Sequence, residues 1–152
     1  MSRGVQMVFA VAVSVAGLAF AAGGGCDTGM NGVPMVPAPE PGDSVSFANH
    51  VQPILTAKCA SCHRTGAFAN SAGIAMLLSA GDAYGSLVNR PSSQNAALTL
   101  VVPGDSANSL LFLKVSQASP PVGSRMPLLA APLSDAEQAL IRDWIDDGAL
   151  NN

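Results

Sequence analysis

The chain is short of charge, and it has no cluster of basic residues. Only 11% of its 152 residues are charged, and seven Lys and Arg against ten Asp and Glu give a net charge of −3. Nucleic-acid binding needs Lys and Arg side chains gathered on one face, where they displace counterions from phosphates. We therefore expect no nucleic-acid partner.

The chain also lacks an apolar run long enough to predict a membrane-spanning helix. Its longest run, from Val8 to Ala22, falls short of the roughly 20 apolar residues that a bilayer requires. Arg3 precedes this run and the small residues 21–25 follow it, which is the pattern of an export signal. We expect residues 1–25 to be a signal peptide and the rest to function in the periplasm or cell envelope.

Cysteine is scarce, and an odd count of three cannot build a disulfide scaffold. Cys26 directly follows the small residues and resembles the lipidated cysteine of a bacterial lipoprotein signal. The usual aliphatic residue three positions earlier is Gly23 here, so ordinary cleavage near Ala22 and an uncleaved helical anchor remain alternatives. The expected membrane contact is a lipid on Cys26.

Residues 26–43 are rich in proline and glycine, which favour extended chain and remove backbone donors. We interpret them as a tether between the membrane and one domain over residues 44–150.

Alternation of apolar and polar residues is also scarce, apart from residues 98–102, so helical patterns dominate and the domain is predicted to be mostly α. A first helix should begin at Asp43 or Ser44, with a kink or restart at Pro53. The clearest helix follows the capping box of Ser134 and Glu137 and ends near Gly148. Weaker patterns predict a helix over 80–89, a short helix after residue 105 or 106, and an extended loop over 116–132.

The motif that carries chemistry is Cys59-Ala-Ser-Cys62-His63. Cys-x-x-Cys-His is typical of c-type haem attachment. Two thiols spaced in this way can add to the two vinyl groups on one porphyrin edge, and the next residue can place its imidazole over the ring to bind iron. We expect one covalent haem c, held by Cys59 and Cys62, with His63 as an iron ligand.

Three other interpretations of the two cysteines fit the sequence less well. A thioredoxin-like pair usually follows a strand, whereas a helical pattern precedes this one. A structural zinc site needs four ligands, and only His50 and carboxylates are left to complete it. A Cys59–Cys62 disulfide would close a short and strained loop.

The second iron ligand has four candidates: Met76, Met126, His50 and, less plausibly, Lys114. Met126 lies in a proline-flanked loop, which can hold a thioether at low entropic cost, and it is far enough from His63 to reach the opposite haem face. Met76 fits core packing and His50 a solvated helix face. Met126 is therefore the predicted distal ligand.

Several segments in the same order resemble a class I cytochrome c domain, in particular its planctomycete-type subgroup; they are residues 47–55, 59–63, 102–111, 125–127 and 133–149. The resemblance implies a helical fold around one haem, with crossed first and last helices. It also implies His63 as proximal ligand, Met126 as distal ligand, and electron transfer as the activity. No clear Gly-Pro-x-Leu segment follows His63, so the group that orients its ring is not identified from the sequence.

The sequence thus predicts a one-electron carrier, not an enzyme, that exchanges electrons with redox partner proteins. One alternative is a haem enzyme or sensor, such as a peroxidase-like protein, with a displaceable sixth ligand. Another is a lipoprotein whose haem is only structural. Arg125 is either a partner for a haem propionate or a solvated side chain.

Overall fold

The computed structural model describes residues 36–40 and 43–152, and this part of the chain contains helices and no strand. The prediction that the domain is mostly α is therefore confirmed for the described residues. The predicted signal peptide, Cys26 and most of the tether lie outside the described residues. No helix in the described ranges is long and apolar enough to cross a membrane.

The first helical segment has two parts, a π-helix η1 (Phe47–Val51) and an α-helix α1 (Gln52–Lys58). Ser46 caps it, because its Oγ accepts a hydrogen bond of 3.2 Å from the Asn49 N–H. The predicted start at Asp43 or Ser44 was therefore wrong by a few residues. The predicted restart is confirmed, because the π-helix ends at Val51 and Pro53 occupies the first turn of α1.

The last helix, α5 (Asp135–Asp146), has both halves of the predicted capping box. The Glu137 N–H donates to Ser134 Oγ at 3.2 Å, and the Ser134 N–H donates to Glu137 Oε2 at 2.8 Å. Gly148 ends the segment with φ of 100°, a conformation that favours glycine. The apolar face of α5, with Ile141, Trp144 and Ile145, is fully buried.

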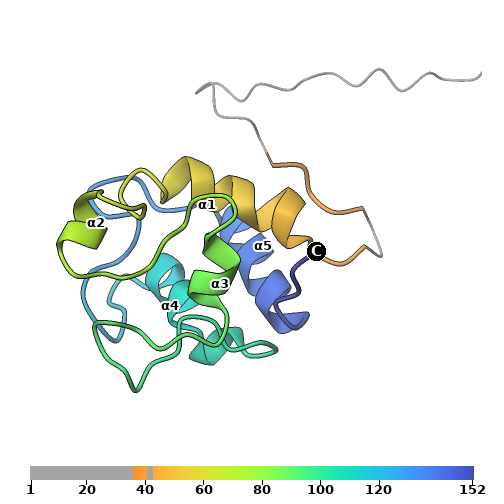
Figure 1. Cartoon of the computed structure of the whole chain (residues 1–152). Coiled ribbons are helices and arrows are strands. Elements are labelled where there is room, and N and C mark those ends of the chain that lie inside the picture. Colours follow the sequence, from red (N-terminus) through yellow and green to blue (C-terminus); the bar gives the residue numbers. More distant parts are fainter. Residues whose placement is uncertain (1–35, 41–42) are drawn as a thin grey trace, which may run out of the picture.

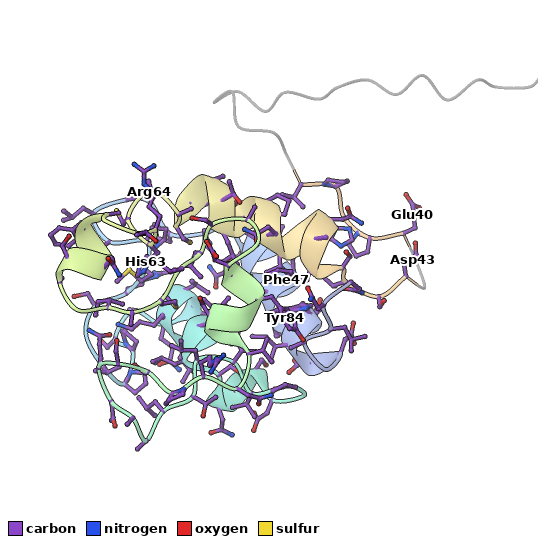
Figure 2. All side chains as sticks on the ribbon, viewed as in Figure 1. Glu40, Asp43, Phe47, His63, Arg64 and Tyr84 are labelled. Atoms are coloured by element: carbon purple, nitrogen blue, oxygen red, sulfur yellow. The ribbon has the colours of Figure 1, made fainter. Side chains whose placement is uncertain are left out.

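An aromatic cluster joins the first and last helical segments. The ring of Phe47 lies 5.0 Å from that of Trp144 and 5.4 Å from that of Tyr84, between centroids. Tyr84 belongs to α3 (Ala83–Leu87) and donates its hydroxyl to the Ala149 carbonyl at 3.0 Å. Figure 1 shows α5 passing behind η1 and α1, and Figure 2 shows Phe47 beside Tyr84.

A turn and two short helices complete this side of the core. Asp105 caps the 3-10 helix η2 (Ser106–Asn108), and α4 (Leu110–Ser116) follows. Asp146 of α5 accepts hydrogen bonds from the Ser106 N–H at 2.9 Å and the Ser106 hydroxyl at 3.0 Å. These bonds fix the start of the η2–α4 segment to the end of α5.

The weaker sequence patterns predicted the structure only in part. The helix expected over residues 80–89 is only five residues long, and α2 (Phe68–Ser71) was not predicted. Residues 98–102 form only isolated bridges, Val88 with Val101 and Pro91 with Thr99. The predicted extended loop over 116–132 is confirmed from Gln117 onward, after the end of α4.

We predict that Ser134→Ala lowers the free energy of unfolding by about 1 kcal/mol, because the hydroxyl no longer accepts from the Glu137 N–H or donates to Glu137 Oε2. Denaturant unfolding followed by Trp144 fluorescence measures the change. Ser119→Ala, in the exposed loop, is the matched control and should have little effect. Equal midpoints for the two variants would contradict a stabilising role for the capping box.

Candidate functional site

The four residues predicted to hold a haem line one cavity. Its volume is about 990 Å³, and Cys59, Cys62, His63 and Met126 are all among its lining residues. Small-molecule and cofactor sites commonly measure roughly 300–1,000 Å³ and are mostly apolar with a few polar groups. The cavity is therefore large enough for a cofactor of porphyrin size.

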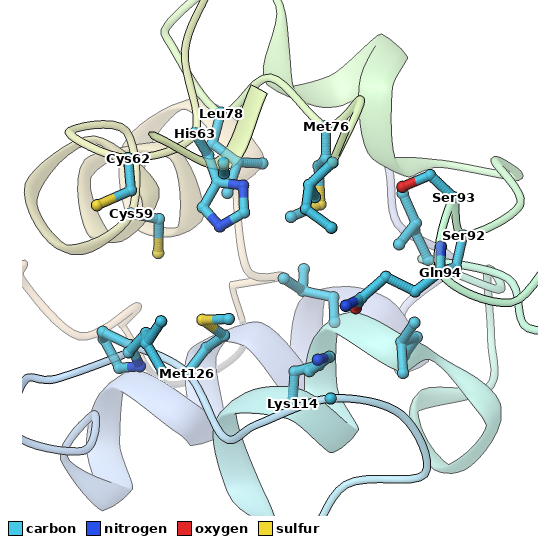
Figure 3. A pocket seen from close by; sticks show the side chains of 18 of the residues that line it. Cys59, Cys62, His63, Met76, Leu78, Ser92, Ser93, Gln94, Lys114 and Met126 are labelled. Carbon is cyan, nitrogen blue, oxygen red and sulfur yellow. The ribbon is translucent and has the colours of Figure 1, made fainter. Parts of the chain in front are cut away.

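The Cys-x-x-Cys-His motif forms a compact turn directly after α1. The Cys59 N–H donates to the Leu55 carbonyl at 2.9 Å, which continues the helical pattern for one residue. The Cys62 and His63 N–H groups then both donate to the Cys59 carbonyl, at 3.1 and 3.0 Å. The turn brings the two thiol side chains and the imidazole together at one side of the cavity (Figure 3).

His63 is held at the cavity wall with little exposure. Its residue is 8% exposed, and its carbonyl accepts a hydrogen bond of 2.7 Å from the Leu78 N–H. The side chain is directed into the body of the molecule, whereas Arg64 next to it is exposed (Figure 2). A rigid backbone on both sides of His63 thus fixes where the imidazole lies.

Burial lowers the pKa of His63, a nearby backbone group of Met76 opposes this shift, and the Lys114 cation adds to it. A lowered pKa favours the neutral imidazole, which is the form that binds metals. Nδ1 is buried and has no well-formed hydrogen bond within the described residues. The Met76 backbone, which approaches the ring, is therefore the nearest group that can orient it, and no motif in the sequence pointed to it.

Met126 enters the cavity from the opposite side. Figure 3 shows its thioether facing the His63 imidazole across the cavity, whereas Met76 lies on the same side as His63. The Met126 N–H donates to the Lys114 carbonyl at 2.8 Å, so α4 positions this part of the loop. His50 does not line the cavity, and its Nδ1 accepts a hydrogen bond of 2.8 Å from the Ser46 N–H.

The environment of Cys59 does not suit thiol–disulfide chemistry. Burial, then Glu137 and Cys62, raise the pKa of the Cys59 thiol to about 11, against a smaller lowering by Lys58. Reactive redox cysteines have a lowered pKa, because the thiolate is the nucleophile. Cys59 and Cys62 are not joined by a disulfide.

Across residues 36–40 and 43–152, no group of three or more His, Cys, Asp or Glu side chains could hold a metal ion.

Comparison of the chain with models of protein families, with curated proteins and with solved structures found no match.

The residues present fit a c-type haem in their chemistry. The cavity offers two thiols from one turn of chain, a buried imidazole whose Nδ1 has no well-formed hydrogen bond within the described residues, and a thioether that faces it. Thiols for attachment and His and Met for axial ligation are a known set for cytochromes c. Cys59 and Cys62 would hold the porphyrin edge, and His63 and Met126 would hold the iron.

Proposed function

We propose that this protein is a one-electron carrier with a single covalently bound haem c, ligated by His63 and Met126, and that it is not an enzyme. The observation that carries the proposal is the placement of His63 and Met126 on opposite sides of one cavity, with Cys59 and Cys62 beside His63 (Figure 3). When bound, the haem supplies an iron that cycles between Fe(II) and Fe(III).

The residues around the cavity suit electron transfer better than catalysis. His63 and Met126 lie on opposite sides of the cavity, so both could hold the iron of a haem bound between them. Such a haem would have no open site for a substrate. Cys62 is exposed, so the attachment edge would lie near the surface, where a redox partner protein could approach. We further propose that the fold is of the cytochrome c type, with η1–α1 and α5 as its crossed helices.

We also propose that the domain works outside the cytoplasm. Residues 1–25 would be removed as a signal peptide, and a lipid on Cys26 would anchor the protein to the cell envelope.

The first test is covalent attachment. We expect the full chain, expressed with haem-maturation machinery, to carry one haem that survives denaturation and appears in the intact mass. Replacing Cys59 and Cys62 by Ser should abolish that mass increase, and the protein should be poorly folded because haem binding and folding share their free energy. Wild-type protein without covalent haem would refute the proposed function.

The second test concerns the distal ligand. We expect Met126→Ala to abolish the Met–iron charge-transfer band and to let cyanide or carbon monoxide bind, because the sixth position opens. Met76→Ala is the matched control and should keep the band, since Met76 lies on the His63 side of the cavity. An unchanged band in Met126→Ala would exclude Met126. Ready binding of cyanide to the wild type would favour an enzyme or sensor.

The third test concerns the anchor. Cys26→Ser should move the haem protein from the membrane fraction to the soluble periplasmic fraction, because no lipid can be attached. Thr28→Ser, two residues further on, should leave the protein with the membrane. A wild-type protein that is already soluble would show that cleavage occurs without lipidation.

A further inference from the structure

The cavity has two chemically different ends. The thiols of Cys59 and Cys62 lie at one end, and Ser92, Ser93 and Gln94 lie at the other (Figure 3). Ser92 is buried, at 4% exposure, and its hydroxyl accepts a hydrogen bond of 3.2 Å from the Gln94 N–H. The end away from the cysteines is therefore polar, although no motif in the sequence marks it.

One buried cation belongs to this polar region. Lys58, Arg90 and Lys114 are the cationic residues that line the cavity. Lys58 Nζ lies 3.7 Å from Oε1 of Glu137 and forms an ion pair with it. Arg90 is exposed, and its Nε donates a hydrogen bond of 2.9 Å to the Gly85 carbonyl. Lys114 is only 8% exposed, and its Nζ makes a single hydrogen bond of 3.2 Å, to the Ser124 carbonyl.

Within the described residues, Lys114 has no carboxylate partner. A buried ammonium without a counter-ion is strongly unfavourable, because it gives up hydration and gains little in return. An anion at this point of the cavity would remove that penalty.

The backbone passes close to this cation at Gly123. A Cβ at position 123 would lie 2.8 Å from Lys114 Nζ, closer than such atoms approach one another, and 3.1 Å from Gln94 Nε2, which is a tight contact. The backbone at Gly123 also has φ of 61°, which favours glycine. The ammonium and the amide therefore meet at the same glycine, and both can donate hydrogen bonds to one acceptor.

We infer that Lys114, assisted by Gln94, binds a propionate carboxylate of the haem; this rests on the proposed function. The vinyl groups and the propionates of haem lie on opposite edges of the ring. Attachment at Cys59 and Cys62 fixes the vinyl edge at one end of the cavity, so the carboxylates must point toward the other end. A carboxylate there meets a buried ammonium and forms a charge-assisted hydrogen bond.

Arg125, considered from the sequence as a propionate partner, is placed differently. It does not line the cavity, and its Nη2 donates to the Val115 carbonyl at 3.4 Å. Lys114 lines the cavity and Arg125 does not, so Lys114 suits the haem carboxylates better than Arg125.

Resonance Raman spectroscopy of the haem-loaded full chain tests this inference, because the propionate bending band reports the hydrogen bonds of the carboxylates. We expect Lys114→Met to shift the band and Gln94→Leu to shift it less, with the His/Met absorption spectrum unchanged. Lys58→Met removes the same charge at the cysteine end of the cavity and should leave the band in place. Gln94 is exposed, so Gln94→Leu decides the question if Lys114→Met yields no holoprotein.

An unshifted band in both the Lys114 and Gln94 variants, with haem attached and both axial ligands intact, would overturn the inference alone. An equal shift in Lys58→Met would overturn it too, because the effect would not be local to Lys114. If the wild-type chain carried no covalent haem, the proposed function itself would fail before this question arose.

Discussion

The packing of Phe47 against Trp144 is the contact on which the rest of the described structure depends. It joins the first helical segment to α5 with 5.0 Å between ring centroids, and Trp144 is fully buried. The Trp144 Nε1–H also donates to the Leu150 carbonyl at 2.8 Å, which folds the end of the chain back over the ring. Because α1 leads directly into the Cys59–His63 turn, this contact also sets where the imidazole side of the cavity lies.

The opposite side of the cavity is fixed to the same helix by a second route. The Asp146 carboxylate, at the end of α5, accepts hydrogen bonds from the backbone N–H and the hydroxyl of Ser106. The neighbouring Ile145 carbonyl accepts a hydrogen bond of 2.7 Å from the Gly104 N–H. Ser106 begins the segment that leads into α4, and the Lys114 carbonyl of α4 holds the Met126 N–H. Both sides of the cavity are therefore held in place by contacts with α5. A loop that looks unstructured in sequence can then hold Met126 in place without regular structure of its own.

What the sequence could predict was local. The capping box of Ser134 and Glu137, the restart at Pro53 and the Cys-x-x-Cys-His turn each depend on residues a few positions apart, and the structure contains all three. Met126 was predicted from loop context, and it faces the cavity. The burial of Lys114 and the approach of the Met76 backbone to His63 could not be predicted, because they arise between segments distant along the chain. The five-residue length of α3 has the same origin, since tertiary packing overrides a weak helical pattern.

The charges around the cavity bear on how such a haem would behave. His63 and Met126 would be neutral ligands, and the buried Lys114 ammonium adds a positive charge that the described protein residues do not balance. In a weakly polar cavity such a charge disfavours Fe(III) more than Fe(II), and with His/Met ligation it should raise the reduction potential. A propionate bound by Lys114 would cancel much of this effect, because the pair is nearly neutral when seen from the iron. The same contact that seats the haem in the cavity would therefore also moderate its potential, so that anchoring and redox tuning depend on one buried side chain.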